Sequence, residues 1–254
     1  MDFSLIIPTY REAENIPILV QRISQLALDP WQFEVLIIDD NSNDGTQEIV
    51  QQLQHHYTWL KIIVRKKSRS LSQSVIDGFN LAKYPLLITM DADLSHPPEK
   101  IPHILDLFNN GPTDFVIGSR YVKEGRIAEK WPWHRKVISW GAALIARWLI
   151  ATAVKDPLSG FFALKKSLYN AANHLEPIGW KIGLELIIKC NCKNIREIPI
   201  HFSERLHGQS KLNLRISLNY VRHIQRLFFH KLHQASFFKL LAAIRQRFTF
   251  KKSR

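Results

Sequence analysis

The sequence predicts an α/β protein in which helices flank a mostly parallel, doubly wound β-sheet. Short apolar segments typical of buried strands alternate with longer segments in which apolar residues recur at helical spacing. Acidic or basic residues directly follow several of these strands, so polar groups are expected to meet along one rim of the sheet. A chain of 254 residues, 46% of them hydrophobic, is also long and apolar enough to bury a large core.

The first half of the chain contains five predicted strands. We expect them at 2–7, 34–38, 59–64, 86–90 and 114–118, all rich in apolar or β-branched residues. Helices are expected between them, at 16–26, after Asp44, at 70–82 and from Pro97 to Phe108. Asp44 is suited to capping its helix, and proline is common at the start of a helix. Alternation of this kind joins parallel strands through helical crossovers.

The second half is less regular. A mostly apolar segment at 137–154 is interrupted by Arg147, which argues against a transmembrane helix and for an interfacial or core helix. A turn into a short strand at 155–162, a helix at 181–190 and a last strand at 195–202 are expected in turn. Cys190 and Cys192 have neither the number nor the spacing of a disulfide framework or a zinc site, so we expect reduced cysteines on the helix.

The segment around Asp91 and Asp93 carries the first chemical signal. Both aspartates follow the strand at 86–90, and on an extended segment the D-x-D spacing places both carboxylates on one face. Such a pair is a hard oxygen site for Mg²⁺ or Mn²⁺ bridging a diphosphate, to which Ser95 would add a hydroxyl or a bound water. Taken alone, two solvated aspartates at a strand end are the commoner explanation, because so short a motif often occurs by chance.

Two nucleotide-binding motifs are missing from the sequence. No G-x-G-x-x-G follows the first strand, and no G-x-x-x-x-G-K-[ST] occurs anywhere. A dinucleotide-dependent dehydrogenase and a P-loop nucleotidase are therefore disfavoured. Without a glycine-rich cradle, phosphate charge would be met by a metal ion and by arginines.

Positive charge is concentrated at the end of the chain. The formal net charge is +13, and residues 201–254 contain twelve Lys or Arg against a single acidic residue, Glu204. Residues 212–254 mix apolar and basic side chains, with no charge-free run long enough to span a bilayer. Two interpretations are open for this tail: a helix packed on its own domain with a solvated basic face, or a helix on a membrane surface. We therefore divide the chain into a domain at 1–211 and a basic amphipathic helical tail at 212–254.

The two ends of the chain also bear on location and partners. Met1 to Ser4 lack the basic region of a signal peptide and Pro8 interrupts the apolar run that follows, so a cytoplasmic protein is expected. A basic tail is compatible with nucleic-acid binding. However, it has few aromatic platforms spaced for stacking and no RRM, KH or zinc signature, so a nucleic-acid-binding module is the weaker alternative.

Five motifs occur in one order at sensible intervals: Pro8–Glu12, Asp39–Thr46, Asp91–Asp93, Gly118–Tyr121 and Glu204–Lys211. Together they resemble the inverting family 2 glycosyltransferases of GT-A fold, and within them the dolichol-phosphate or polyprenol-phosphate mannosyltransferases. The similarity runs from about Asp2 to Leu212. Each residue alone has a structural explanation, such as a surface ion pair or a helix cap, but agreement among independent signals favours function.

The resemblance implies a site for a nucleotide sugar. In such a site the nucleoside would contact Pro8, Tyr10, Glu12, Asp39 and Asp40. Asp91 and Asp93 would bind Mg²⁺ or Mn²⁺ against the donor diphosphate, with Ser95 where some relatives carry a glutamine ligand. Arg205 and Lys211 would close over that diphosphate from the late loop. Asp91, Asp93 and Arg205 are thus the expected catalytic residues.

The resemblance also implies a site for an anionic acceptor. Arg120, Arg135 and Ser139 would receive the acceptor phosphate beside the helix at 137–154. The sequence departs from the family pattern in two loops, where Arg11 replaces the commoner asparagine and Ser70-Leu71-Ser72 replaces a glycine-containing segment. These changes affect the expected nucleotide contacts rather than the reaction class.

The implied reaction is inverting transfer of a hexose, with mannose from GDP-mannose as first candidate, onto a polyprenyl or dolichyl phosphate. A phosphate is already ionised at neutral pH, so catalysis would rest on positioning and charge stabilisation without a general base. The alternatives are a UDP-glucose-dependent undecaprenyl-phosphate glucosyltransferase and a transferase with a hydroxyl acceptor, for which Asp156 would be the base. The resemblance further implies peripheral attachment to the cytoplasmic face of a membrane, and in some relatives a membrane-anchoring subunit.

Overall fold

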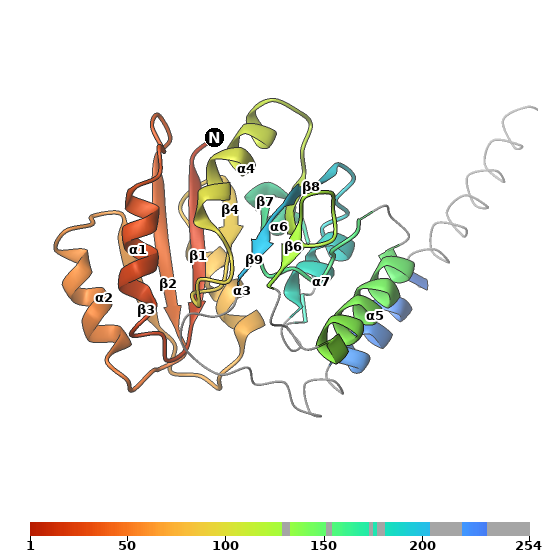
Figure 1. Cartoon of the computed structure of the whole chain (residues 1–254), viewed down its shortest axis with the longest axis horizontal. Coiled ribbons are helices and arrows are strands. Elements are labelled where there is room, and N and C mark those ends of the chain that lie inside the picture. Colours follow the sequence, from red (N-terminus) through yellow and green to blue (C-terminus); the bar gives the residue numbers. More distant parts are fainter. Residues whose placement is uncertain (129–132, 151–153, 173–174, 177–180, 204–219, 233–254) are drawn as a thin grey trace, which may run out of the picture.

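The computed structural model describes residues 1–128, 133–150, 154–172, 175–176, 181–203 and 220–232 (Figure 1). Its first elements are β1 (Phe3–Thr9), α1 (Ile16–Ser24), β2 (Phe33–Asp39), α2 (Thr46–Gln54), β3 (Leu60–Val64), α3 (Leu71–Leu81), β4 (Leu86–Thr89), the 3₁₀ turn η1 (Pro98–Lys100), α4 (Ile101–Asn109) and β5 (Phe115–Ser119). They are followed by β6 (Arg126–Ile127), α5 (Trp133–Ile150), β7 (Phe162–Lys165), α6 (Lys166–Ala171), α7 (Ile182–Lys189), β8 (Ile195–Pro199) and β9 (His201–Phe202). Residues 220–232 are helical.

Seven of these strands form one sheet, in the order β3-β2-β1-β4-β7-β5-β8. The pairs β1–β2, β1–β4, β2–β3 and β5–β8 are parallel, as the sequence predicts. β7 is antiparallel to both of its neighbours, β4 and β5. The mostly parallel α/β fold is therefore confirmed, with one reversed strand near its middle.

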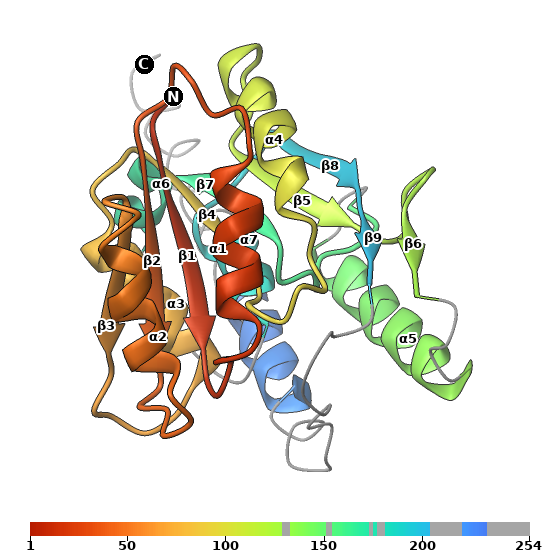
Figure 2. The same ribbon diagram turned by 60° about the vertical axis from the view of Figure 1, so that its left-hand side comes forward.

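Both faces of the sheet are covered by helices, which explains why its strands are almost continuously apolar. Alternate side chains of β1 point to opposite faces, as the period of a strand requires. Leu5 and Ile7 share a hydrophobic core with Leu19 of α1, whereas Ile6 shares a second core with Val75 of α3. Helices α1, α2 and α4 thus pack on one face, and α3, α6 and α7 on the other (Figures 1 and 2).

Helix α5 and the helix at 220–232 pack together at the end of the molecule opposite β3 (Figure 1). The Tyr220 hydroxyl donates to the carbonyl of Ala142 at 2.7 Å, and the rings of Trp148 and Phe228 stack with centroids 6.0 Å apart. Trp148 remains 73% exposed despite this contact. Of the helices that the structure describes, none combines the length and the apolar character needed to cross a bilayer.

Several sequence predictions differ from the structure in detail. The predicted last strand is two strands, β8 in the main sheet and β9 in a small second sheet with β6. Helix α6 was not predicted, because six residues are too few to show helical periodicity. Gly45 rather than Asp44 is the N-cap of α2, although the Asp44 carboxylate accepts from the Thr46 N–H at 3.2 Å.

The two cysteines lie beyond the helix on which they were expected. Helix α7 ends at Lys189, so Cys190 is its C-cap and Cys192 follows in the next turn. Both are free thiols, as predicted. Burial raises the pKa of each thiol to about 12, which makes them unreactive packing residues.

Candidate active site

Two loops at the carboxyl end of the parallel strands are tied together by hydrogen bonds. The Arg11 N–H donates to Ser42 Oγ at 2.8 Å, and the Glu12 N–H donates to Thr46 Oγ1 at 3.1 Å. Arg11 adopts a left-handed φ of 59°, which turns the chain sharply after β1. The segment containing Tyr10 and Glu12 therefore lies against the acidic turn after β2, where the predicted nucleoside residues were expected to meet.

Asp39 and Asp40 are buried, and internal partners occupy both carboxylates. Asp39 accepts from the hydroxyl and the N–H of Ser42, at 2.6 and 2.8 Å. Asp40 forms an ion pair with Arg65, whose side chain is only 3% exposed, and also accepts from the Ser70 N–H at 3.0 Å. These contacts show the two acids holding the loops in shape, and their predicted contacts with a nucleoside stay predictions.

Tyr10 presents an aromatic surface with cations beside it. The guanidinium carbon of Arg69 lies 4.3 Å from the centre of its ring and that of Arg11 lies at 5.3 Å. Pro8 is the next-to-last residue of β1 and is paired in register with Ile38 of β2. The predicted donor-site residues are thus neighbours at one rim of the sheet, and their roles remain predictions.

The D-x-D segment is a loop rather than an extension of β4, so the strand geometry expected for it is wrong. β4 ends at Thr89, and Leu94 adopts a left-handed φ of 62°. The Asp91 side chain is 31% exposed, whereas Asp93 is only 5% exposed. The Ser95 hydroxyl donates to Asp93 Oδ1 at 2.5 Å, and the Ser95 N–H donates to the same oxygen at 3.1 Å. Ser95 therefore orients Asp93, and its predicted role as a metal ligand stays a prediction.

His96 is a residue of this loop that the sequence analysis did not select. Its Nδ1 accepts the N–H of Asp91 at 3.1 Å, so the ring is neutral with its proton on Nε2. Burial lowers the pKa of His96, and the 3.7 Å approach of Nδ1 to the Asp91 carboxylate is accordingly no ion pair. The ring packs against Phe161 and Phe202, with centroids 5.6 and 5.3 Å away. His96 thus fixes the backbone that carries Asp91.

The two carboxylates of this loop suit a divalent cation that also binds the substrate. Mg²⁺ and Mn²⁺ prefer oxygen ligands, and Mg²⁺ is commonly held by one or two carboxylates together with substrate phosphates. Among the residues that the structure describes, no cluster of three or more His, Cys, Asp or Glu is arranged to hold a metal ion. Asp91 and Asp93 therefore fit a metal that takes its remaining ligands from a diphosphate, rather than a closed protein site.

Arg120, which directly follows β5, is held by the buried Asp156. Its Nε and Nη2 each donate to one carboxylate oxygen of Asp156, both at 2.8 Å. The side chains are 8% and 0% exposed. Burial opposes the charge of Arg120, but the hydrogen bonds and charge of Asp156 outweigh it and raise the pKa of the guanidinium. The guanidinium also lies over the ring of Phe202, 5.4 Å from its centre, so the same ring contacts Arg120 and His96.

Ser139 of α5 is linked to this arginine through Tyr121, over whose ring the guanidinium lies at 5.3 Å from the centre. Its hydroxyl is hydrogen-bonded to the hydroxyl of Tyr121 at 2.9 Å, and Tyr121 directly follows Arg120. Arg135 lies one helical turn before Ser139, and its side chain is outside the described part of the structure. The structure thus brings two of the three predicted acceptor residues, Arg120 and Ser139, to one corner, while their binding roles stay predictions.

The turn at 156–160 joins the acidic loop to the arginine. It leads into β7, and because β7 runs antiparallel between β4 and β5, this turn lies at the carboxyl ends of both strands. At one end of the turn Asp156 binds Arg120. At the other, a Cβ built on Gly160 would lie only 3.2 Å from Asp91 Oδ1. The same five-residue turn therefore contacts both Asp91, a predicted metal ligand, and Arg120, a predicted phosphate-binding residue.

Lys181 is a second residue that the sequence analysis did not select. It is the N-cap residue of α7, and its Nζ donates to the carbonyl of Leu158 at 2.8 Å, within the same turn. Burial, with the nearby charge of Arg120 adding to it, lowers the pKa of Lys181 to about 8. In the sequence this lysine simply precedes an apolar helix, which gave no reason to select it.

Arg205 and Lys211 lie outside the described residues. The described segment before them ends at Ser203, whose N–H donates to the carbonyl of Ser95 at 3.1 Å. The chain therefore enters the predicted late loop from a residue bonded to the D-x-D loop. The closing role of Arg205 and Lys211 stays a prediction.

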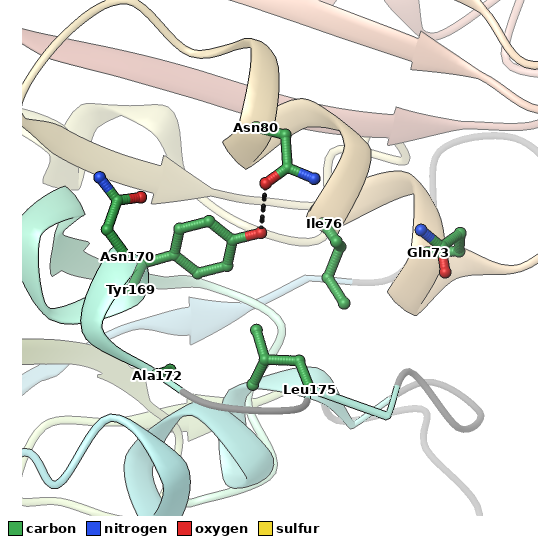
Figure 3. A pocket seen from close by; sticks show the side chains of 7 residues that line it. All are labelled: Gln73, Ile76, Asn80, Tyr169, Asn170, Ala172 and Leu175. Atoms are coloured by element: carbon green, nitrogen blue, oxygen red, sulfur yellow. Dashed lines mark hydrogen bonds between the residues drawn. The ribbon is translucent and has the colours of Figure 1, made fainter.

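A cavity of about 440 Å³ lies elsewhere, between α3 and α6 (Figure 3). Its walls are Gln73, Ile76, Asn80, Tyr169, Asn170, Ala172 and Leu175. The Tyr169 hydroxyl donates to Asn80 Oδ1 at 2.7 Å, as Figure 3 shows. None of these wall residues is charged, so the cavity lacks the cations that a phosphate or diphosphate requires.

Known proteins resemble this chain over most of its length. A dolichol-phosphate mannosyltransferase of Pyrococcus furiosus is 44% identical over 229 residues, which cover 89% of this chain but only 64% of that protein. Proteins of the same name from Mycosarcoma maydis and Saccharomyces cerevisiae are 40% and 36% identical, over 233 and 241 residues. These alignments cover 89% and 91% of this chain and 78% and 88% of the two relatives.

Solved structures show the same fold. Glucosyl-3-phosphoglycerate synthase of Mycobacterium tuberculosis, in complex with Mn²⁺, UDP-glucose and phosphoglyceric acid, matches with a TM-score of 0.66 at 15% identity, over 90% of this chain and 79% of that one. The same enzyme with Mn²⁺, UDP and glucosyl-3-phosphoglycerate matches with a TM-score of 0.62 at 17% identity, over 91% and 78%. The model of glycosyl transferase family 2 matches residues 4–171. The predicted family and the predicted GT-A fold are confirmed, and the chain belongs to glycosyl transferase family 2.

Proposed function

We propose that this protein transfers mannose from GDP-mannose, with inversion, onto the phosphate of dolichol or another polyprenol. The observation that carries the proposal is the turn at 156–160, which contacts the Asp91 carboxylate at Gly160 and binds the buried Arg120 through Asp156. A transferase that joins a diphosphate donor to a phosphate acceptor needs both groups in one place. The names of the relatives, which are dolichol-phosphate mannosyltransferases, give the proposal its sugar and its acceptor.

The state of Asp156 favours a phosphate acceptor over a hydroxyl. A hydroxyl acceptor needs a general base, and Asp156 was the candidate for that role. Its two oxygens accept from Arg120 at 2.8 Å each, and the side chain is fully buried. A carboxylate so engaged is poorly placed to take a proton from a substrate. A phosphate oxygen attacks without losing a proton, so it requires no base.

Each residue around this turn then has a specific role in the proposed reaction. Asp91 and Asp93 would hold Mg²⁺ or Mn²⁺, which when bound supplies charge stabilisation for the departing diphosphate. His96 fixes the backbone of Asp91 through the contact at 3.1 Å, and Ser95 orients the carboxylate of Asp93 through the contact at 2.5 Å. Arg120 orients the acceptor phosphate with the donors that Asp156 leaves available. Catalysis is then chiefly positioning and electrostatics.

The proposal includes peripheral attachment to a membrane, where a polyprenyl phosphate is found. Helix α5 and the helix at 220–232 expose large apolar side chains, namely Trp140, Leu144, Ile145, Trp148, Val221, Phe229 and Leu232. Clusters of exposed apolar side chains on paired helices suit the interface of a bilayer. Binding to anionic vesicles that weakens in high salt would support this attachment, and no binding at any salt concentration would refute unaided attachment and leave an anchoring subunit to be sought.

The direct test is transfer of label to lipid. Purified protein, Mg²⁺ or Mn²⁺ and dolichyl phosphate in vesicles are incubated in parallel with labelled GDP-mannose, UDP-glucose and GDP-glucose, and the lipid is extracted. We expect label in lipid from GDP-mannose, dependent on the divalent ion. Label from UDP-glucose alone, with undecaprenyl phosphate as the better acceptor, would replace mannose and dolichol in the proposal with the alternative substrates.

A further inference from the structure

The Arg120–Asp156 pair contributes little net positive charge to the acceptor site. Arg120 uses Nε and Nη2, one of the bidentate edges of its guanidinium, on the carboxylate of Asp156. The pair also has no net charge. A phosphate monoester carries a charge of about −1.5 to −2 at neutral pH. Among the side chains that the structure describes at this site, a second cation would therefore favour binding of such an anion, beside any contribution of Arg135, which lies outside them.

Lys181 is a cation placed to meet that need. Its ammonium bonds the carbonyl of Leu158, two residues after Asp156, and its charge acts on Arg120, Asp156 and Asp91. Within the described part of the chain its hydrogen bond goes to a neutral carbonyl, which uses one of the three donors of an ammonium. Part of the residue remains open to solvent. An ammonium that is largely withdrawn from water and bonds a neutral carbonyl gains from an anion that binds beside it.

We propose that Lys181 binds the phosphate of the acceptor, as a second cation beside Arg120. The inference rests on the proposed function and deepens it, because it names a residue that confers preference for a charged acceptor. In this arrangement the carbonyl of Leu158 holds the ammonium of Lys181, and Asp156 holds the guanidinium of Arg120. The turn at 156–160 therefore positions both cations beside the loop that contains Asp91. The two cations neutralise the acceptor while Asp156 keeps Arg120 in place.

The test compares Lys181→Met with Lys181→Arg in the transfer assay. Losing a hydrogen bond to a charged group should raise the KM for polyprenyl phosphate about tenfold or more, while the KM for the donor changes less than about twofold. Lys181→Arg keeps the charge and should recover most of the affinity. Lys166→Met is the matched control, because Lys166 Nζ also donates to a backbone carbonyl, that of Ala82, at the opposite end of β7.

A binding measurement separates this inference from the proposed function. Calorimetric titration with a short-chain prenyl phosphate reports acceptor affinity even if the transferred sugar has been misidentified. The proposal predicts weaker binding in Lys181→Met and unchanged binding in Lys166→Met, with equal melting temperatures. Wild-type affinity in Lys181→Met overturns it. Equal loss of affinity for donor and acceptor also overturns it, because that pattern marks a structural lysine.

Discussion

Two pairs of aspartates lie at the carboxyl ends of β2 and β4, the two strands that flank β1, and their surroundings differ. Asp39 and Asp40, after β2, are 0% and 8% exposed and are occupied by internal partners, including the ion pair with Arg65. Asp93, after β4, is also buried, but the side chain of Asp91 remains 31% exposed and lies beside Gly160, in the turn whose Asp156 binds Arg120. Acidic residues after a parallel strand therefore serve two purposes, shaping the rim and meeting a ligand, and only their partners distinguish the two.

The largest effect is expected from Asp91→Asn. Removing one carboxylate from a two-carboxylate metal site should lower the transfer rate by about 10³-fold, or about 4 kcal/mol, with little change in melting temperature because Asp91 is partly exposed. Initial rates at saturating Mn²⁺, with calorimetric Mn²⁺ binding in the presence of GDP, measure both. Asp106→Asn, at an exposed position of α4, is the control. Near-normal activity in Asp91→Asn would remove the distinction between the two pairs.

Asp40→Asn should do the opposite and reduce stability first. The variant removes one of the two carboxylates that pair with the buried Arg65 and leaves it only Asp77, and losing hydrogen bonds to a charged group costs about 1.5–3 kcal/mol. Urea denaturation would measure the loss of unfolding free energy, with Glu99→Gln as control. Glu99 pairs with Arg22 on the surface, where both side chains are at least a third exposed, so its loss should cost less than about 1 kcal/mol. Equal stability of the two variants would contradict the structural role of Asp40.

Gly160→Ala should have the smallest effect, and it tests whether the turn at 156–160 contacts the metal-binding loop. The added Cβ would lie 3.2 Å from both Asp91 Oδ1 and His96 Cε1, so the loop must shift by a few tenths of an ångström. We expect Mn²⁺ affinity to fall about threefold to tenfold, or about 1 kcal/mol. Gly111→Ala, whose Cβ would meet nothing closer than 3.8 Å, should be silent. An unchanged Mn²⁺ affinity in Gly160→Ala would show that the turn does not touch the metal site.

The sequence was most informative where the local pattern decides the structure. The apolar runs of β1, β2 and β3 were predicted to within one or two residues, and α3 lies inside the predicted 70–82 with Ser70 as its N-cap. β1 and β2 are buried on both faces, so their composition alone marks them, and the edge strand β3 keeps the same apolar run. The reversed direction of β7 was not predictable, because a four-residue apolar strand pairs equally well in either direction.

The same reversal accounts for what was missed at the site. It brings the turn at 156–160, and with it the bond to Lys181, to the carboxyl ends of β4 and β5. No spacing in the sequence links Lys181 to Arg120, which precedes it by 61 positions. His96 was missed for a different reason. It accepts a hydrogen bond from a backbone N–H, and a contact of this kind leaves no recognisable pattern of side chains in the sequence. Asp91 and Arg120 were found because each follows a predicted strand within two residues.

We propose above all that the metal ion and the acceptor phosphate bind close together in one site. Relaxation of the phosphorus nucleus by Mn²⁺ tests this proximity most directly. The ³¹P signal of a short-chain prenyl phosphate would be recorded with protein and GDP, in Mn²⁺ and in diamagnetic Mg²⁺. The account predicts strong Mn²⁺-dependent relaxation of both GDP and the prenyl phosphate, lost for both in Asp91→Asn and for the prenyl phosphate alone in Arg120→Gln. A prenyl phosphate that binds the protein but is not relaxed by Mn²⁺ would contradict the account.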